Sequence, residues 1–210
     1  PQGPPMTRLE AIRSIETGIE IADEKAREGY RVFTIGEMGI SNTTSSACIL
    51  GAFNHWNAIE VTGRGTNISD ERLRHKIDVV QRAMDVNHPD PNDGLDVLSK
   101  VGGFEYGCMT GVILGAAANH ALTIIDGFNT TASAFMAKAL CPEVVHYLMA
   151  SHLSLEQAHK KSLAALGLTE YIDLDFRLGE AIGAGIQTRM LDYALSVYRE
   201  CAAKDEEVKA

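Results

Sequence analysis

The stretch YRVFTIGEMGISNTT, residues 30–44, passes from an apolar, β-prone run into a turn rich in glycine and polar side chains. Residues 45–53 continue it with small residues that suit a helix. A strand, a turn and a helix in this order are typical of a parallel α/β sheet, in which such turns face the ligand crevice at the carboxyl ends of the strands. We therefore expect a ligand near this turn.

The turn has the composition of an anion-binding site. Backbone N–H groups at the start of the following helix attract anions, and Gly36 and Gly39 let a ligand approach the backbone closely. Glu37 is the odd element, because a carboxylate beside a bound anion is repulsive unless the chemistry requires it. A purely structural alternative is a capped helix behind an ordinary strand, with Ser41 or Asn42 as the N-cap.

Composition argues against several classes of protein. The 210 residues include 19 basic and 28 acidic ones, a formal net charge of −9, which speaks against nucleic acid as a partner. A small phosphate ligand stays possible, since a helix N-terminus and one local cation suffice to hold it. No apolar run reaches the roughly 20 residues of a membrane-spanning helix, so no membrane is expected. Cys48, Cys108, Cys141 and Cys201 are widely spaced, which predicts reduced thiols in a cytoplasmic protein.

A second strand is predicted at residues 122–125, and it ends in Asp126-Gly127. Asn129-Thr130-Thr131 then repeats the Asn42-Thr43-Thr44 that follows the first strand. Asn and Thr are good helix caps, which is the structural explanation of the repeat. The functional alternative is that two such turns, side by side at one sheet edge, offer two sets of N–H donors to one ligand.

Helical patterns separate the two strands. Thr7 and Glu10 form a capping box before a helix that reaches Gly29, and Ser69 caps a charged helix. Residues 104–119 suit a buried helix, Ser154 with Gln157 predicts another, and Gly179-Glu180 opens a last one to about Glu200. We therefore expect an α/β fold with a parallel, Rossmann-like sheet flanked by helices. The sequence predicts only two strands for this sheet, so either some strands are missed or the sheet is incomplete.

Glu180 and His152 are the remaining candidates for proton transfer. Small and apolar residues follow Glu180, so its carboxylate should be partly desolvated, which suits a general base. An acidic residue in a first helical turn is also ordinary structure. His152 is read as structural rather than as an acid–base group. A dinucleotide-binding redox enzyme is disfavoured, because no G-x-G-x-x-G follows a strand, and Asp126 lacks the second acid of the common phosphoribosyltransferase loop.

Taken together, these segments resemble the nicotinate-nucleotide–dimethylbenzimidazole phosphoribosyltransferase family. The resemblance runs in the family's order and spacing through nearly the whole chain, at Gly36–Thr44, Thr62–Thr66 with Lys76, Gly102–Glu105, Asp126–Phe128, Ser151–Glu156 and Arg177–Glu180. It implies transfer of ribose phosphate from nicotinate mononucleotide to dimethylbenzimidazole, giving α-ribazole phosphate and nicotinate, in assembly of the lower ligand of cobalamin. It also implies a cytoplasmic homodimer that needs no cofactor and no metal.

The resemblance also assigns roles to residues. Glu180 becomes the general base, and Glu37 a second active-site carboxylate near the base and ribose. The substrate-binding residues that it implies lie in two groups. The phosphate side has Gly39, Ser41, Asn42, Thr43, Gly65 and Lys76, and the ribose and nucleotide side has Asp126, Gly127, Ser154 and Gly179.

The chain departs from the family in three ways. Ser41 stands where members usually have glycine or another small residue, and Ala181-Ile182 stands where they have glycine followed by Ser or Thr. These changes make a different acceptor base an alternative. Members also carry a long N-terminal part before the segment that begins here, so a nucleotide-binding fragment without turnover is a second alternative.

The expected organisation has three parts. Residues 1–30 are a linker and helix that contribute to a small helical subdomain, incomplete in this chain. Residues 31–200 form the nucleotide-binding α/β domain, and residues 201–210 form a charged tail.

Overall fold

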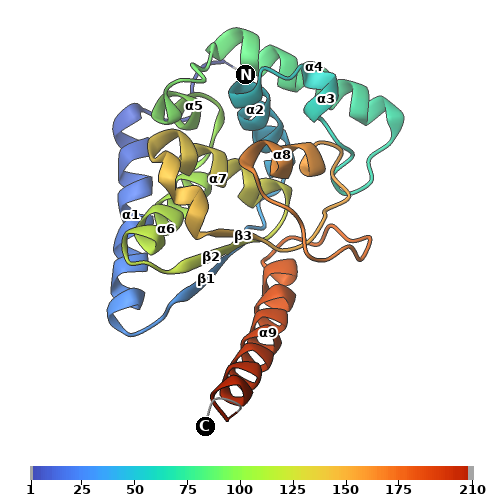
Figure 1. Cartoon of the computed structure of the whole chain (residues 1–210). Helices are drawn as coiled ribbons and strands as arrows, with labels where there is room; N and C mark the ends of the chain where they lie inside the picture. Colours follow the sequence, from blue (N-terminus) through green and yellow to red (C-terminus); the bar gives the residue numbers. More distant parts are fainter. Residues whose placement is uncertain (1, 208–210) are drawn as a thin grey trace.

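The computed structural model describes residues 2–207 and contains a parallel sheet covered by helices (Figure 1). Within these residues the sheet has three strands in the order β1-β2-β3: Val32–Ile35, Leu122–Ile125 and Leu148–Ala150. Val32 lies opposite Leu122, and Thr123 lies opposite Leu148. All three strands are parallel, so their carboxyl ends lie at one edge of the sheet. The predicted α/β class and the two predicted strands are confirmed.

Helices make up most of the remaining structure. They are α1 (Arg8–Arg27), α2 (Asn42–Asn54), α3 (Ala58–Val61), α4 (Asp70–Asn87), α5 (Gly94–Val101), α6 (Phe104–Ala118), α7 (Phe128–Leu140), the 3-10 helix η1 (Pro142–Tyr147), α8 (His159–Leu166) and α9 (Ile182–Glu207). Two predicted starts are confirmed. Thr7 and Glu10 form the capping box of α1, and the Ser69 hydroxyl accepts a hydrogen bond from the Arg72 N–H of α4. None of these helices is both long and apolar enough to cross a membrane.

Helices α1 and α6 lie side by side with their backbones in contact (Figure 1). A Cβ atom added at Gly18 would come within 2.0 Å of the Cys108 carbonyl oxygen, and one at Gly111 within 2.0 Å of the Ile15 carbonyl oxygen. Neither carbonyl can move without bending a helix. Glycine is therefore required for this close approach. The small-residue composition of α6 follows from this packing.

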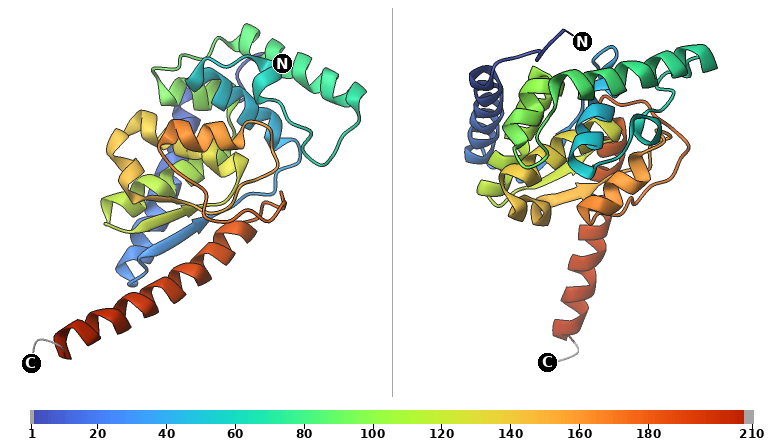
Figure 2. Two further views of the ribbon diagram at one scale, coloured as in Figure 1. Left: turned by 45° about the vertical axis from the view of Figure 1, so that its right-hand side comes forward. Right: turned by 90° about the horizontal axis from the view of Figure 1, so that it is seen from above.

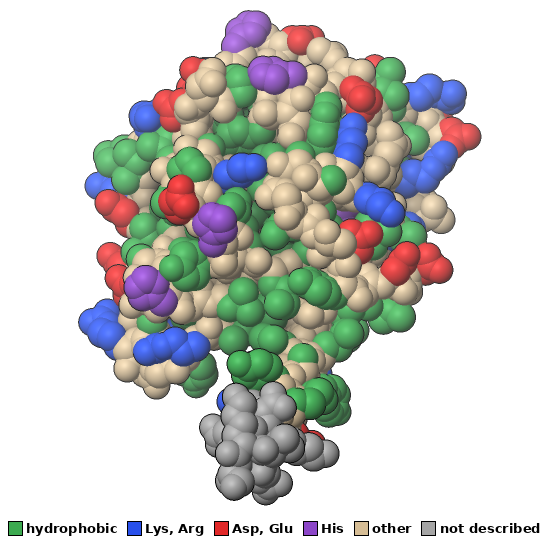
Figure 3. All heavy atoms as spheres, in the orientation of Figure 1, with side chains coloured by type: hydrophobic (Ala, Val, Ile, Leu, Met, Phe, Trp, Pro, Cys, Tyr) green, Lys and Arg blue, Asp and Glu red, His purple; other side chains and the backbone are tan. Residues whose placement is uncertain are grey.

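Helices α6 and α7 pack on the sheet, whereas α9 leaves from its other side (Figure 2). Only the first turns of α9 contact β1 and β2, and the rest projects away from the body. Apolar side chains of α9, among them Ile186, Met190 and Tyr193, are exposed. In Figure 3 hydrophobic side chains gather where α9 leaves the body.

Three sequence-based expectations were wrong in detail. Strand β3 was missed, because it is only three residues long and directly follows η1. Ser154 and Gln157 do not cap α8, which begins only at His159, after a bend at residues 155–156 and a turn at residues 157–158. The last helix begins at Ile182 rather than at Glu180, and continues to Glu207 beyond the predicted end. Part of the predicted charged tail, residues 208–210, lies outside the described residues, and the division of the chain at residues 30 and 200 stays a prediction.

Candidate active site

One cavity of about 700 Å³ opens at the carboxyl ends of β1 and β2. Every residue that the sequence suggested for the site contributes to its lining: Glu37, Gly39, Ser41, Asn42, Thr43, Gly65, Lys76, Asp126, Gly127, Ser154, Gly179 and Glu180. The turn after β1, the loop before α4, the end of β2 and the turn before α9 therefore converge, although the chain separates them widely. Their chemical roles stay predictions.

The turn after β1 has an unusual backbone. Ser41 stands at the N-cap position of α2 with φ +73°, in the left-handed region, and its hydroxyl makes no capping hydrogen bond. The Asn42 side chain does not cap α2 either, because its amide turns back to the Glu37 carboxylate. Both residues predicted as caps therefore fail to cap with their side chains. Of the first backbone N–H groups of α2, those of Asn42 and Thr44 donate to the Gly39 and Ser41 carbonyls. No side chain caps the others among the described residues, which suits them to an anion.

Lys76 supplies the positive charge at this end of the cavity. Its ammonium group donates to the Thr43 hydroxyl at 2.8 Å and to the Gly63 carbonyl at 3.0 Å. Burial lowers the pKa of Lys76, while the negative charge of Glu156 opposes that shift. Gly65 lies beside these groups with φ +54°, a conformation that favours glycine. The helix start, the lysine and this loop thus form a cationic end.

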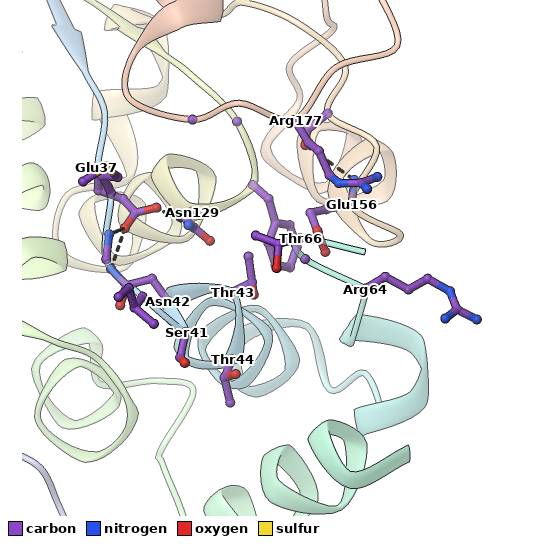
Figure 4. A pocket seen from close by; sticks show the side chains of 18 of the residues that line it. Glu37, Ser41, Asn42, Thr43, Thr44, Arg64, Thr66, Asn129, Glu156 and Arg177 are labelled. Carbon is purple, nitrogen blue, oxygen red and sulfur yellow. Dashed lines mark hydrogen bonds between the residues drawn. The ribbon is translucent and has the colours of Figure 1, made fainter. Parts of the chain in front are cut away.

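Glu37 lies apart from that end and is held by three donors (Figure 4). One carboxylate oxygen accepts the Gly39 N–H at 2.8 Å and the Asn42 amide at 2.5 Å, and the other accepts the Asn129 amide. The two asparagines are the first residues of the repeated Asn-Thr-Thr segments, on the neighbouring helices α2 and α7. The repeat thus supplies side-chain donors to Glu37, where the sequence suggested backbone donors to a ligand.

Glu180 reaches the same region from the turn before α9. Gly179, Glu180 and Ala181 have φ values of +73°, +58° and +61°, so three consecutive left-handed residues exclude a helix here. The Glu180 N–H donates to the Glu37 carbonyl at 3.2 Å, which ties the two turns together. The Glu180 side chain is exposed, and no hydrogen bond to it was found among the described residues. The partial burial predicted for Glu180 was therefore wrong.

Asp126 sits at the end of β2 and holds the start of α9. Its Oδ1 atom accepts the Ala184 N–H at 3.0 Å and lies 3.8 Å from Nδ1 of His152. Burial raises the pKa of Asp126, against hydrogen bonds from α9 and the nearby imidazole. Burial also lowers the pKa of His152, which stacks on Phe176 at 4.3 Å between ring centroids. His152 is buried, in line with the structural role predicted for it.

Ser154 and Glu156 are buried beside the cationic end. The Ser154 hydroxyl accepts the Glu156 N–H at 3.4 Å. Burial raises the pKa of Glu156, while Lys76 and Arg177 act in the opposite direction. Its Oε2 atom has no hydrogen-bond partner among the described residues.

The cavity is also lined by residues to which the sequence assigned no role in the site. Among them are Asn129, Glu156, Arg177, Arg64 and the apolar Met38, Ile40 and Leu178. Asn129 was visible through the repeated segment, but its direction was not. Met38, Ile40 and Leu178 were harder to recognise in the sequence, because exposed apolar side chains do not recur with the period of a helix or a strand. Their exposed fractions of 74%, 98% and 61% now mark them as an open apolar wall.

Comparisons with known proteins agree on one family. A phosphoribosyltransferase family model matches residues 1–208. The chain is 50% identical over 204 residues to the nicotinate-nucleotide–dimethylbenzimidazole phosphoribosyltransferase of Syntrophotalea carbinolica, covering 97% of this chain and 58% of the relative. It is 44% identical to the protein of that name from Clostridioides difficile, covering 98% of this chain and 59% of that relative.

A solved structure is similar as well. The crystal structure of CobT from Thermus thermophilus matches with a TM-score of 0.87 and 38% identity, over 92% of this chain and 58% of that one. The chain thus spans about 58% of the length of the relatives that it matches.

Proposed function

Because this chain belongs to the nicotinate-nucleotide–dimethylbenzimidazole phosphoribosyltransferase family, we propose that it transfers ribose phosphate from nicotinate mononucleotide to dimethylbenzimidazole. The products are α-ribazole phosphate and nicotinate, in assembly of the lower ligand of cobalamin. One observation carries the proposal: a single cavity joins a cationic end, suited to a phosphate, to an end with two carboxylates.

The nucleotide phosphate occupies the cationic end in this proposal. Lys76 supplies the charge, and the N–H groups at the start of α2 and the left-handed Gly65 supply donors and space. The ribose then lies toward Gly127 and Ser154. This orientation directs the anomeric carbon toward Glu37 and Glu180.

Glu180 acts as the general base. An azole N–H of the acceptor loses its proton to the Glu180 carboxylate, and the freed nitrogen attacks the anomeric carbon. The bond from that carbon to nicotinate breaks, and its electron pair neutralises the pyridinium ring. General-base assistance of this kind is worth about 10²–10⁴-fold. The hydrogen-bond pattern supports the choice, because Glu37 already accepts three donors and the exposed Glu180 carboxylate accepts none that was found.

The acceptor base meets the apolar wall of Met38, Ile40 and Leu178. These side chains line the carboxylate end of the cavity, and a flat aromatic ring buries apolar area against them. Nothing in this wall is specific to dimethylbenzimidazole. The acceptors can be ranked by measuring turnover with dimethylbenzimidazole, other benzimidazoles, adenine and phenols under one condition. A clear preference for another base would replace dimethylbenzimidazole in the proposal.

Nucleotide binding without turnover is the second candidate. Calorimetric titration with nicotinate mononucleotide and an assay of nicotinate release, on the same sample, separate the two. Binding with release supports the transferase, and binding without release supports the fragment. Glu180→Gln keeps the size of the side chain and should abolish release while nucleotide binding persists. Unchanged release in this variant would remove Glu180 as the base.

We also propose that the protein works in the cytoplasm as a homodimer. All four cysteines are free thiols within the described part of the chain, which suits a reducing compartment. The exposed apolar side chains of α9 are available for an interface. Light scattering at several protein concentrations measures the mass, and a persistent monomer would contradict the dimer.

A further inference from the structure

A buried chain of polar side chains leads from α6 to Glu37. The Tyr106 hydroxyl lies 2.7 Å from Oγ of Ser46, and Oγ of Ser46 lies 2.7 Å from Oδ1 of Asn129. The Asn129 amide nitrogen donates to the Glu37 carboxylate. Tyr106 and Ser46 are fully buried, so neither reaches the cavity itself. We call Tyr106, Ser46 and Asn129 the relay.

The relay has fewer hydroxyl protons than contacts, which limits the directions that its hydrogen bonds can take. The Tyr106 hydroxyl also lies 2.7 Å from the Asn42 carbonyl oxygen, so two hydroxyl protons face three oxygen–oxygen contacts. Burial raises the pKa of Tyr106 well above its ordinary value of 10, so the hydroxyl keeps its proton at neutral pH. One of the three contacts must therefore lack a proton.

Glu37 fixes the direction of the hydrogen bonds made by Asn129 and Ser46. A carboxylate only accepts, so the Asn129 NH₂ group must face Glu37, and the Asn129 carbonyl must face Ser46. That carbonyl is satisfied only when Ser46 donates its proton to it. The Tyr106 O–H then donates to the Asn42 carbonyl or to Oγ of Ser46, and in either case the Ser46 proton stays on the contact to Asn129. The Ser46 proton and the Asn129 NH₂ group thus both point toward Glu37.

We propose that Tyr106 and Ser46 are positioning residues, which fix the Asn129 amide with its NH₂ group toward Glu37. This inference rests on the proposed function. Without the Tyr106 hydroxyl, which contacts both Ser46 and the Asn42 carbonyl, the Ser46 hydroxyl is free to bond the Asn42 carbonyl four residues earlier, as serine commonly does within helices. Asn129 then loses the donor that distinguishes its two orientations. A rotated amide would present its oxygen to Glu37 and repel the carboxylate.

The relay matters because it sets what Glu37 can bind. Two oxygens offer about four lone-pair sites, and three of them are filled by Gly39, Asn42 and Asn129. One site remains, on the oxygen that Asn129 contacts. Glu37 is therefore set to accept a single substrate donor, an O–H or N–H group of the bound nucleotide or acceptor. A relay variant should weaken that contact and leave the phosphate end unchanged.

The test compares Tyr106→Phe, Ser46→Ala and the double variant in the whole chain. Each single change should weaken nicotinate mononucleotide binding, measured by calorimetry, by about tenfold, the cost of one hydrogen bond to a charged group. The double variant should bind no more weakly than Ser46→Ala, because both changes interrupt one relay. Binding of inorganic phosphate, followed by ³¹P NMR, should stay within about twofold. Tyr147→Phe is the matched control, because that hydroxyl contacts His120 outside the cavity.

A second measurement needs no substrate. In ¹⁵N-labelled protein the Asn129 side-chain NH₂ signals, assigned by their loss in Asn129→Ala, should exchange slowly with water in the wild type and fast in Tyr106→Phe. Unchanged exchange, an unchanged nucleotide affinity in Ser46→Ala, or additive losses in the double variant would each overturn the relay. A wild-type chain that binds phosphate but not the nucleotide would overturn the proposed function, and this inference with it.

Discussion

Ala181 is held in a conformation that its side chain disfavours, so replacing it with glycine should stabilise the protein. The residue has φ +61° in the turn that carries Glu180, and its backbone packs directly on Gly36. A Cβ atom at Gly36 would come within 2.2 Å of the Ala181 nitrogen, so the turn cannot relax toward the strand. The strain therefore persists in the folded state.

The expected gain is a balance of two effects. A left-handed conformation costs an L-residue about 1–2 kcal/mol, which glycine does not incur. Glycine in turn has more freedom in the unfolded chain, which costs about 0.4–1 kcal/mol. Ala181→Gly should therefore raise the free energy of unfolding by about 0.5–1 kcal/mol. For a chain of this length that corresponds to about 1–4 °C in Tm.

Urea unfolding and thermal melting measure this change against a matched control. Ala194 is an exposed residue in the middle of α9, where the same substitution should destabilise by about 0.5–1 kcal/mol. The two variants carry the same substitution, one in a left-handed and one in a helical backbone conformation, so the effects should have opposite signs. If Ala181→Gly destabilised as much as Ala194→Gly, the strain at Ala181 would be refuted.

Three further predictions concern the site and its support. Lys76→Gln should weaken nicotinate mononucleotide binding about 10–100-fold in calorimetry, since a contact to a charged group is worth about 1.5–3 kcal/mol; an undiminished affinity would remove Lys76 from the phosphate site. Gly36→Ala should lower the free energy of unfolding in urea by about 1–3 kcal/mol through the clash described above, and a neutral effect would mean that the turn can shift. Burial lowers the pKa of His159 from 6.5 to about 3, so below pH 6.5 the unfolded chain binds a proton that the folded chain excludes. Stability should be complete above pH 6.5 and fall by about 1 kcal/mol per pH unit toward pH 3. Urea unfolding at several pH values measures the slope, which His159→Gln should flatten; an equally steep loss in the variant would assign the slope to other groups.

The sequence predicted the parts of the fold that depend on local pattern. The apolar runs before Gly36 and Asp126 are strands, and the Thr7 and Ser69 caps lie where side-chain chemistry requires them. Strand β3 escaped prediction because three residues give no period. It exists through its pairing with β2, a long-range contact that no local pattern encodes.

The sequence predicted which residues line the site, but not how their side chains are arranged. The twelve expected residues line one cavity, because motifs at the ends of parallel strands must meet at one sheet edge. The direction of the Glu37 side chain was not predictable, since two of its three donors come from α2 and α7. Likewise the left-handed turn at Glu180 is imposed by packing against Gly36, whereas its composition suggested the first turn of a helix.

The glycine-lined contact between α1 and α6 bears on how the molecule comes apart. Because only glycines and small side chains such as Ser14 and Ala22 lie between the two helices, neither can move away by a small amount and stay in van der Waals contact with the other. The two helices should therefore separate in one cooperative step, and the amide protons of both should exchange with solvent at one rate. Cutting the chain after residue 30 would remove α1 and expose the backbone of α6 that it covers.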